Sequence, residues 1–137
     1  MKYKRVYLAG PMRGYPQWNH PAFFAAADKL RQLGCEIVWN PAEHDKHIGF
    51  DNNKSELSVE DFQRMMRWDF ERVMEAEAVV FLHGWTRSRG ACAERLIAYY
   101  LGIPCLDYID YGNGDISLIR QDDINEPTVQ FPDPLPF

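Results

Sequence analysis

The chain has 137 residues, of which 46% are hydrophobic, 14% are aromatic and 26% are charged, and its formal net charge is −5. A chain of this length normally forms one domain around one hydrophobic core. Because an acidic chain lacks the broad basic face that a nucleic-acid polymer requires, the sequence favours a small-molecule ligand over DNA or RNA.

The cysteines and the apolar runs indicate the expected compartment. Cys35, Cys92 and Cys105 are widely spaced and form no CxxC pair, which predicts free thiols, no disulfide framework and no metal site. No apolar run approaches the ~20 residues of a membrane span, and the N-terminal run is too short for a signal peptide. We therefore expect a cytoplasmic protein that needs no membrane, metal or cofactor.

The first half of the chain predicts two strands around one helix. Residues 4–9 are an apolar run that stops at a Gly-Pro pair, and residues 19–33 carry apolar side chains at helical spacing. Residues 35–39 are a second apolar run, which an Asn-Pro pair interrupts. The polar stretch 42–57 is longer than most connections, so we expect a surface loop with a function.

The second half continues the alternation. It predicts a helix over 58–75, a strand over 78–82, a helix over about 90–101 and a strand over 103–108. Ser58 begins a capping pattern that supports the first of these helices.

Short apolar strands that alternate with helices indicate an α/β fold. We expect a doubly wound, flavodoxin-like or Rossmann-like parallel sheet of four or five strands, with helices on both faces. The chain from about residue 109 is rich in Asp, Asn, Gly and Pro, which predicts an irregular tail on a single domain over residues 1–137. In such a sheet the ligand binds beyond the carboxyl ends of the strands, where the strand order switches.

Two loops, over residues 10–15 and 83–90, follow strands at the expected ligand edge. Both precede helices, whose free backbone N–H groups favour an anion, and both carry arginine, which binds phosphate through two hydrogen bonds. Arg13 and Ser88 are therefore candidate anion ligands. The alternative is that Ser88 only caps a helix and that the arginines are solvated. Neither loop has the Walker or the GxGxxG pattern.

Three side chains are candidates for chemistry. Glu94 lies one turn into the third helix, where the macrodipole favours the anion and keeps it available as a nucleophile, although a surface glutamate is the alternative. Asp69, in the second helix, is borderline between a core-facing and a solvent-exposed position. Tyr7 is expected to be buried in the first strand, where its hydroxyl needs a partner, either backbone or a catalytic carboxylate.

Three motifs lie in register with these elements. They are YLAGPMRG at 7–14, WDFERVMEAEAVV at 68–80 and SRGACAE at 88–94, and the last is followed by Gly-Ile-Pro at 102–104. Over about residues 4–106 they resemble, in the same order, the nucleoside 2-deoxyribosyltransferases and the 2′-deoxynucleoside 5′-phosphate N-hydrolases. The match includes the S-x-G-x-x-x-E signature of these enzymes.

The resemblance implies a role for each candidate residue. Glu94 would be the nucleophile on the anomeric carbon, Asp69 the acid/base near the leaving base, and Tyr7 the group that hydrogen-bonds and orients Glu94. The implied substrate-binding residues, which hold the 5′ end among other parts, are Gly10, Pro11, Met12, Arg13, Ser88 and Gly90. The resemblance also implies a homodimer or higher homo-oligomer in which a neighbour completes the site.

The implied activity is cleavage or exchange of the N-glycosidic bond of a (deoxy)nucleoside or its 5′-monophosphate, through a covalent glycosyl-Glu94 intermediate. The alternative is a non-catalytic nucleotide-binding module on the same fold. Glu77 departs from the family, which usually has aspartate there, and the tail does not match the transferases. Trp18, Trp85 and the 42–57 stretch are candidate contacts of the base.

Overall fold

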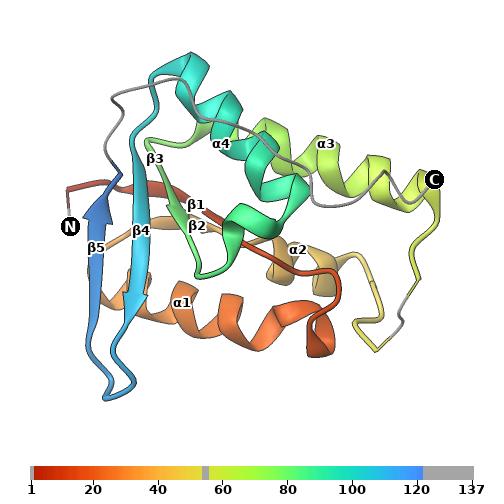
Figure 1. The fold of residues 1–137 in the computed structure, drawn as a ribbon, viewed down its shortest axis with the longest axis horizontal. Coiled ribbons are helices and arrows are strands. Elements are labelled where there is room, and N and C mark those ends of the chain that lie inside the picture. Colours follow the sequence, from red (N-terminus) through yellow and green to blue (C-terminus); the bar gives the residue numbers. More distant parts are fainter. Residues whose placement is uncertain (1, 54–55, 122–137) are drawn as a thin grey trace.

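The computed structural model describes residues 2–53 and 56–121, which form a five-stranded sheet in the order β2-β1-β3-β4-β5 (Figure 1). The strands are β1 (Arg5–Ala9), β2 (Ile37–Trp39), β3 (Ala78–Phe81), β4 (Cys105–Asp110) and β5 (Ile116–Arg120). The helices are α1 (His20–Gln32), α2 (Pro41–His47), α3 (Val59–Glu75) and α4 (Arg89–Leu101). The first four strands are parallel and β5 is antiparallel to β4. The expected doubly wound α/β fold is therefore confirmed.

The alternation of side chains along β1 divides the core into two layers. Val6 and Leu8 pack with α1 on one face of the sheet, whereas Tyr7 and Ala9 pack with α3 and α4 on the other. Figure 1 shows α1 and α2 on the first side of the sheet and α3 and α4 on the second. Tyr7 is therefore directed towards the two helices that carry Asp69 and Glu94.

The expectation of a surface loop over 42–57 is wrong for its first part, because residues Pro41–His47 form α2. The Asn40 side chain accepts a hydrogen bond from the backbone N–H of Ala42 at 2.9 Å, and Pro41 occupies the first turn. An Asn-Pro pair ends a strand, but it is also a favourable helix start, since asparagine caps free N–H groups and proline has none to lose.

The irregular tail expected from about residue 109 is also wrong in its first part. β4 continues to Asp110, and β5 returns along it with Leu106 opposite Arg120. The turn between them is held by side chains: Asp110 accepts from the N–H of Gly112 at 2.8 Å, and Asn113 accepts from the N–H of Asp115 at 3.0 Å. The polar residues thus form a hairpin turn between two apolar runs. The remainder of the predicted tail, 122–137, lies outside the described residues.

Local signals fix the other elements close to their predicted bounds. The Ser58 side chain accepts from the backbone N–H of Asp61 at 3.1 Å and caps α3, as the capping pattern predicts. Glu77 accepts hydrogen bonds from the backbone N–H groups of Lys4 and Arg5 at 2.9 and 2.8 Å, which ties the start of β1 to the chain before β3. In the described part of the chain, no helix is long and apolar enough to span a membrane.

Candidate active site at the carboxyl edge of the sheet

A cavity of about 570 Å³ lies beyond the carboxyl ends of β1 and β3, where the strand order switches. Its walls come from β1 and the loop after it, from α3, and from the loop that leads into α4. The structure brings all of the predicted site residues to this one cavity: Tyr7, Gly10, Pro11, Met12, Arg13, Asp69, Ser88, Gly90 and Glu94. Its volume is in the range that suits a small ligand.

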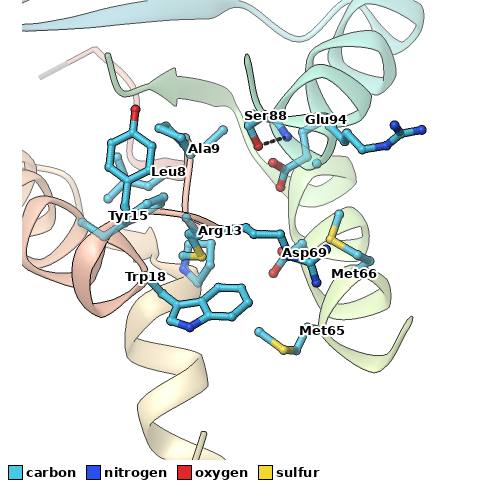
Figure 2. A pocket seen from close by; sticks show the side chains of 18 of the residues that line it. Leu8, Ala9, Arg13, Tyr15, Trp18, Met65, Met66, Asp69, Ser88 and Glu94 are labelled. Atoms are coloured by element: carbon cyan, nitrogen blue, oxygen red, sulfur yellow. Dashed lines mark hydrogen bonds between the residues drawn. The ribbon is translucent and has the colours of Figure 1, made fainter. Parts of the chain in front are cut away.

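Glu94 and Asp69 enter the cavity from two different helices (Figure 2). Glu94 is only 4% exposed, so the alternative of a surface glutamate is wrong. Asp69 follows Met65 by four residues on α3 and precedes Val73 by four, which places it on the inward face of the helix. Tyr7 is fully buried below them in β1. The helical and strand periodicities therefore direct all three polar groups to one place.

Burial controls the proton affinity of these groups. It raises the pKa of Glu94 from 4.5 to about 8, and the neighbouring Tyr7 hydroxyl lowers it by a smaller amount. Burial also raises the pKa of Asp69 well above its usual value, and the charges of Glu94 and then Asp45 raise it further. The helix macrodipole stabilises the anion of Glu94 by only about 0.3–1 kcal/mol. The rise in the pKa from 4.5 to about 8 is larger, because each pKa unit corresponds to about 1.36 kcal/mol. Burial therefore outweighs the predicted effect of the macrodipole.

Two polar atoms of this group have unused hydrogen-bonding capacity. Among the described residues, neither the Tyr7 hydroxyl nor Oε2 of Glu94 has a hydrogen-bond partner of ordinary geometry, although Tyr7 interacts electrostatically with both carboxyls. Buried polar groups usually have partners, and a group that lacks one needs an explanation, of which a catalytic role is one. Both atoms are buried from solvent, so the Tyr7 hydroxyl is placed to act on the two carboxyls.

The anion side of the cavity combines Arg13, Ser88 and the first turn of α4. The Ser88 hydroxyl accepts from the backbone N–H of Ala91 at 3.2 Å, so the capping interpretation is correct, and the same residue also lines the cavity. Arg87 and Arg89 line it too; both belong to the second predicted loop, from which the sequence motifs indicate only Ser88 and Gly90 as ligands. Arginine, hydroxyl and helix N-terminus are the groups that bind phosphate.

Packing is tight around both glycines of the predicted site, and tightest at Gly10. A Cβ atom on Gly10 would lie 2.9 Å from Cβ of Leu82, and one on Gly90 would lie 3.3 Å from Cε of Met66. Gly10 therefore permits close contact between the end of β1 and the chain after β3.

An apolar wall of the cavity includes Trp18, Phe62, Met65 and Met66. Leu57, from the predicted functional loop, also lines it. Trp85, the other tryptophan considered as a base contact, instead packs against Phe81 at 4.7 Å between ring centroids and lines a neighbouring cavity. Sequence spacing identifies α3 as amphipathic, but it does not show which of its apolar residues face the cavity.

Trp18 reaches the wall through an unusual backbone. Gln17, Trp18 and Asn19 have φ values of 54°, 55° and 60°, and in the described part of the chain they are the non-glycine residues with positive φ. The left-handed conformation costs roughly 1–2 kcal/mol per non-glycine residue. Asn19 Nδ2 holds the segment by donating to the carbonyl oxygen of Pro11 at 2.9 Å.

Comparison with protein families matches residues 4–107 to a domain of unknown function, DUF4406. The chain belongs to the DUF4406 family. Comparison with curated proteins and with solved structures gives no match.

The DUF4406 match begins just before β1 and ends within β4, so it contains every residue that lines the cavity. The family description names no activity, and the function of this DUF4406 domain must therefore be inferred from the cavity. In the described segments, no group of three or more His, Cys, Asp or Glu side chains is placed to hold a metal ion.

Proposed function

We propose that this DUF4406 domain cleaves or exchanges the N-glycosidic bond of a (deoxy)nucleoside 5′-monophosphate or nucleoside through a covalent glycosyl-Glu94 intermediate. One observation carries the proposal: the buried carboxyl of Glu94, the half-buried carboxyl of Asp69 and the buried Tyr7 hydroxyl share a cavity with an arginine and a helix N-terminus. The resemblance of the three sequence motifs to enzymes of this chemistry supports the same reading.

The reaction divides between the two carboxyls. As the bond from C1′ to the base nitrogen breaks, Asp69 donates its proton to the base, and a carboxylate oxygen of Glu94 forms a bond to C1′. The sugar passes through an oxocarbenium-like state, for which an anion on one face and an acid at the leaving group are suited, as in retaining glycosidases. Water or a second base then attacks C1′ and gives its proton to Asp69, while the C1′–O bond to Glu94 breaks and returns Glu94 as the carboxylate.

The raised pKa values of Asp69 and Tyr7 agree with this division. Asp69 has to be protonated to act as an acid, and burial together with nearby negative charge raises its pKa well above the ordinary value, which favours the protonated form. Tyr7 has to stay neutral to donate a hydrogen bond to Glu94, and burial raises its pKa well above the ordinary value. The hydroxyl of Tyr7 would thus orient the nucleophile.

The groups around Arg13 favour a substrate with a 5′-phosphate. Arg13 is exposed at the mouth of the cavity, and Ser88 stands at the N-terminus of α4. A dianion gains more than a neutral hydroxyl from a guanidinium and a helix N-terminus. We therefore expect 5′-monophosphates to be preferred over nucleosides.

A second candidate is a nucleotide-binding module without turnover. The observation that favours it is the pKa of about 8 for Glu94, which leaves most of the side chain protonated at pH 7 and therefore weakly nucleophilic. A ligand that lowers the pKa of Glu94 would make this side chain an effective nucleophile. Measurement of product therefore distinguishes the enzyme from the binding module.

The test is release of free base. Deoxynucleosides and their 5′-monophosphates are incubated with the protein, and the products are separated by chromatography. Base release that Glu94→Gln abolishes, and that Glu60→Gln on the exposed start of α3 leaves unchanged, supports the enzyme. Binding of a monophosphate without release of base from any substrate would instead identify the binding module.

A further inference from the structure

The left-handed segment Gln17–Asn19 lies at the mouth of the candidate active site. Three successive non-glycine residues with positive φ are a costly arrangement, which persists only where the surroundings hold it in place. Strained backbone of this kind concentrates at ligand-binding sites. The segment therefore needs an explanation beyond the connection of β1 to α1.

Contacts on both sides hold the segment. The backbone N–H of Trp18 donates to the carbonyl oxygen of Tyr15 at 3.0 Å, and Asn19 donates to the carbonyl oxygen of Pro11 at 2.9 Å. The Trp18 indole meets the Phe50 ring edge-on, with 5.3 Å between centroids. Only 7% of Trp18 is exposed, so the indole has a fixed position.

The strained segment places this indole in the cavity wall. Figure 2 shows Trp18 and Met65 reaching into the pocket from different elements, with Asp69 also directed into it. The Arg13 guanidinium carbon lies 5.9 Å from the centre of the Trp18 ring, so a cation flanks the same indole. An indole, a methionine and a nearby carboxyl form a slot for a flat ring with a nitrogen to protonate.

We propose that Gln17–Asn19 acts as a clamp that fixes the Trp18 indole as the stacking wall for the planar heteroaromatic ring of the ligand. The choice of a nucleobase as that ring rests on the proposed function. The clamp itself concerns binding and not turnover. Pre-organisation by the clamp removes the ordering cost that a mobile tryptophan would add to each binding event.

The experiment compares two kinds of probe, one with a nucleobase and one without. Affinities for the four deoxynucleoside 5′-monophosphates and for 2-deoxyribose 5-phosphate are measured by calorimetry in the Glu94→Gln background, so that turnover does not deplete the probe. Trp18→Leu should weaken the best monophosphate about 10- to 100-fold, the range expected for loss of stacking on an aromatic side chain. Trp18→Phe should recover part of the loss, and 2-deoxyribose 5-phosphate, which has no base, should bind all these proteins equally.

The backbone is tested at Gln17, whose side chain is exposed. Glycine adopts a positive φ without strain, so Gln17→Gly should raise the thermal midpoint of the free protein by about 2–4 °C. Because glycine also makes the segment less rigid, the Trp18 indole is less well pre-organised, and monophosphate binding should weaken about 3- to 10-fold. Gln17→Ala keeps the strain and removes the side chain, so it should bind as the parent does.

Three results would overturn the inference: equal losses on both probes in Trp18→Leu, full affinity in Gln17→Gly, or no binding of any monophosphate by the parent. Binding that depends on Trp18 in a protein that releases no base would reject the proposed reaction and leave the clamp supported. The two proposals therefore fail separately.

Discussion

Replacing Glu94 by glutamine should remove activity and at the same time stabilise the protein at alkaline pH. Glutamine has the shape of glutamate but carries no charge, so it cannot attack carbon, and it needs no proton to remain neutral inside the protein. A buried carboxyl that must ionise for catalysis destabilises the folded state. The size of this destabilisation follows from the shift in the pKa of the carboxyl.

The pKa of Glu94 rises from 4.5 to about 8, and each unit corresponds to about 1.36 kcal/mol. Between these pH values the folded state keeps the proton and the unfolded state releases it, so the free energy of unfolding falls as pH rises from about 4.5 to about 8. Below that window both states are protonated and Glu94 contributes nothing. Burial of this one group therefore costs roughly 3–5 kcal/mol at pH 8.

The assay is urea unfolding at pH 5 and pH 8 for wild type, Glu94→Gln and the exposed control Glu60→Gln. Wild type and Glu60→Gln should lose roughly 3–5 kcal/mol more than Glu94→Gln between the two pH values. Asp69 should add to the difference, because the charge of Glu94 is one cause of its raised pKa. Parallel losses in all three proteins would refute the reasoning, since Glu94 would then ionise as it does in water.

The remaining predictions concern activity. Asp69→Asn should slow turnover of substrates with poorly leaving bases far more than turnover of substrates with activated leaving groups, because the latter need little protonation. Steady-state kinetics on a matched pair of substrates checks this. Equal losses on both substrates would assign Asp69 a structural role. Arg13→Ala should reduce kcat/KM for a monophosphate about 10- to 100-fold and barely change it for the matching nucleoside, whereas the exposed control Arg67→Ala should change neither. The kcat/KM of wild type should rise as pH increases from 6 towards 8, because Glu94, with a pKa of about 8, must lose its proton; a profile that is flat over this range would contradict the ionised nucleophile.

Much of the fold could be predicted because the sequence signals are local. The apolar runs at 4–9 and 78–82 mark the central strands, and the capping pattern at Ser58 marks the start of α3. The failures came from signals with two meanings. The Asn-Pro pair before α2 both ends a strand and begins a helix, and the polar residues between β4 and β5 form a turn and not a tail.

The sequence could predict which residues form the candidate site, but not the pKa values of those residues. Tyr7, Asp69 and Glu94 meet because the period of a strand and the period of a helix each direct side chains to one face. The proton affinity of Glu94 depends on how completely the fold excludes water from it, which no spacing reveals. The position of Trp18 depends on a left-handed backbone that its residue types disfavour.

A covalent sugar on Glu94 is the most direct test of the proposed reaction. The protein is mixed with the deoxynucleoside 5′-monophosphate that releases base fastest, the reaction is quenched with acid within milliseconds to seconds, and the digested peptides are analysed by mass spectrometry. We predict that the peptide containing Glu94 gains the mass of the 2-deoxyribose 5-phosphate residue, that fragmentation places this mass on Glu94, and that Glu94→Gln abolishes the adduct. Base release without any adduct at Glu94, or an adduct on another side chain, would contradict the assignment of Glu94 as the nucleophile.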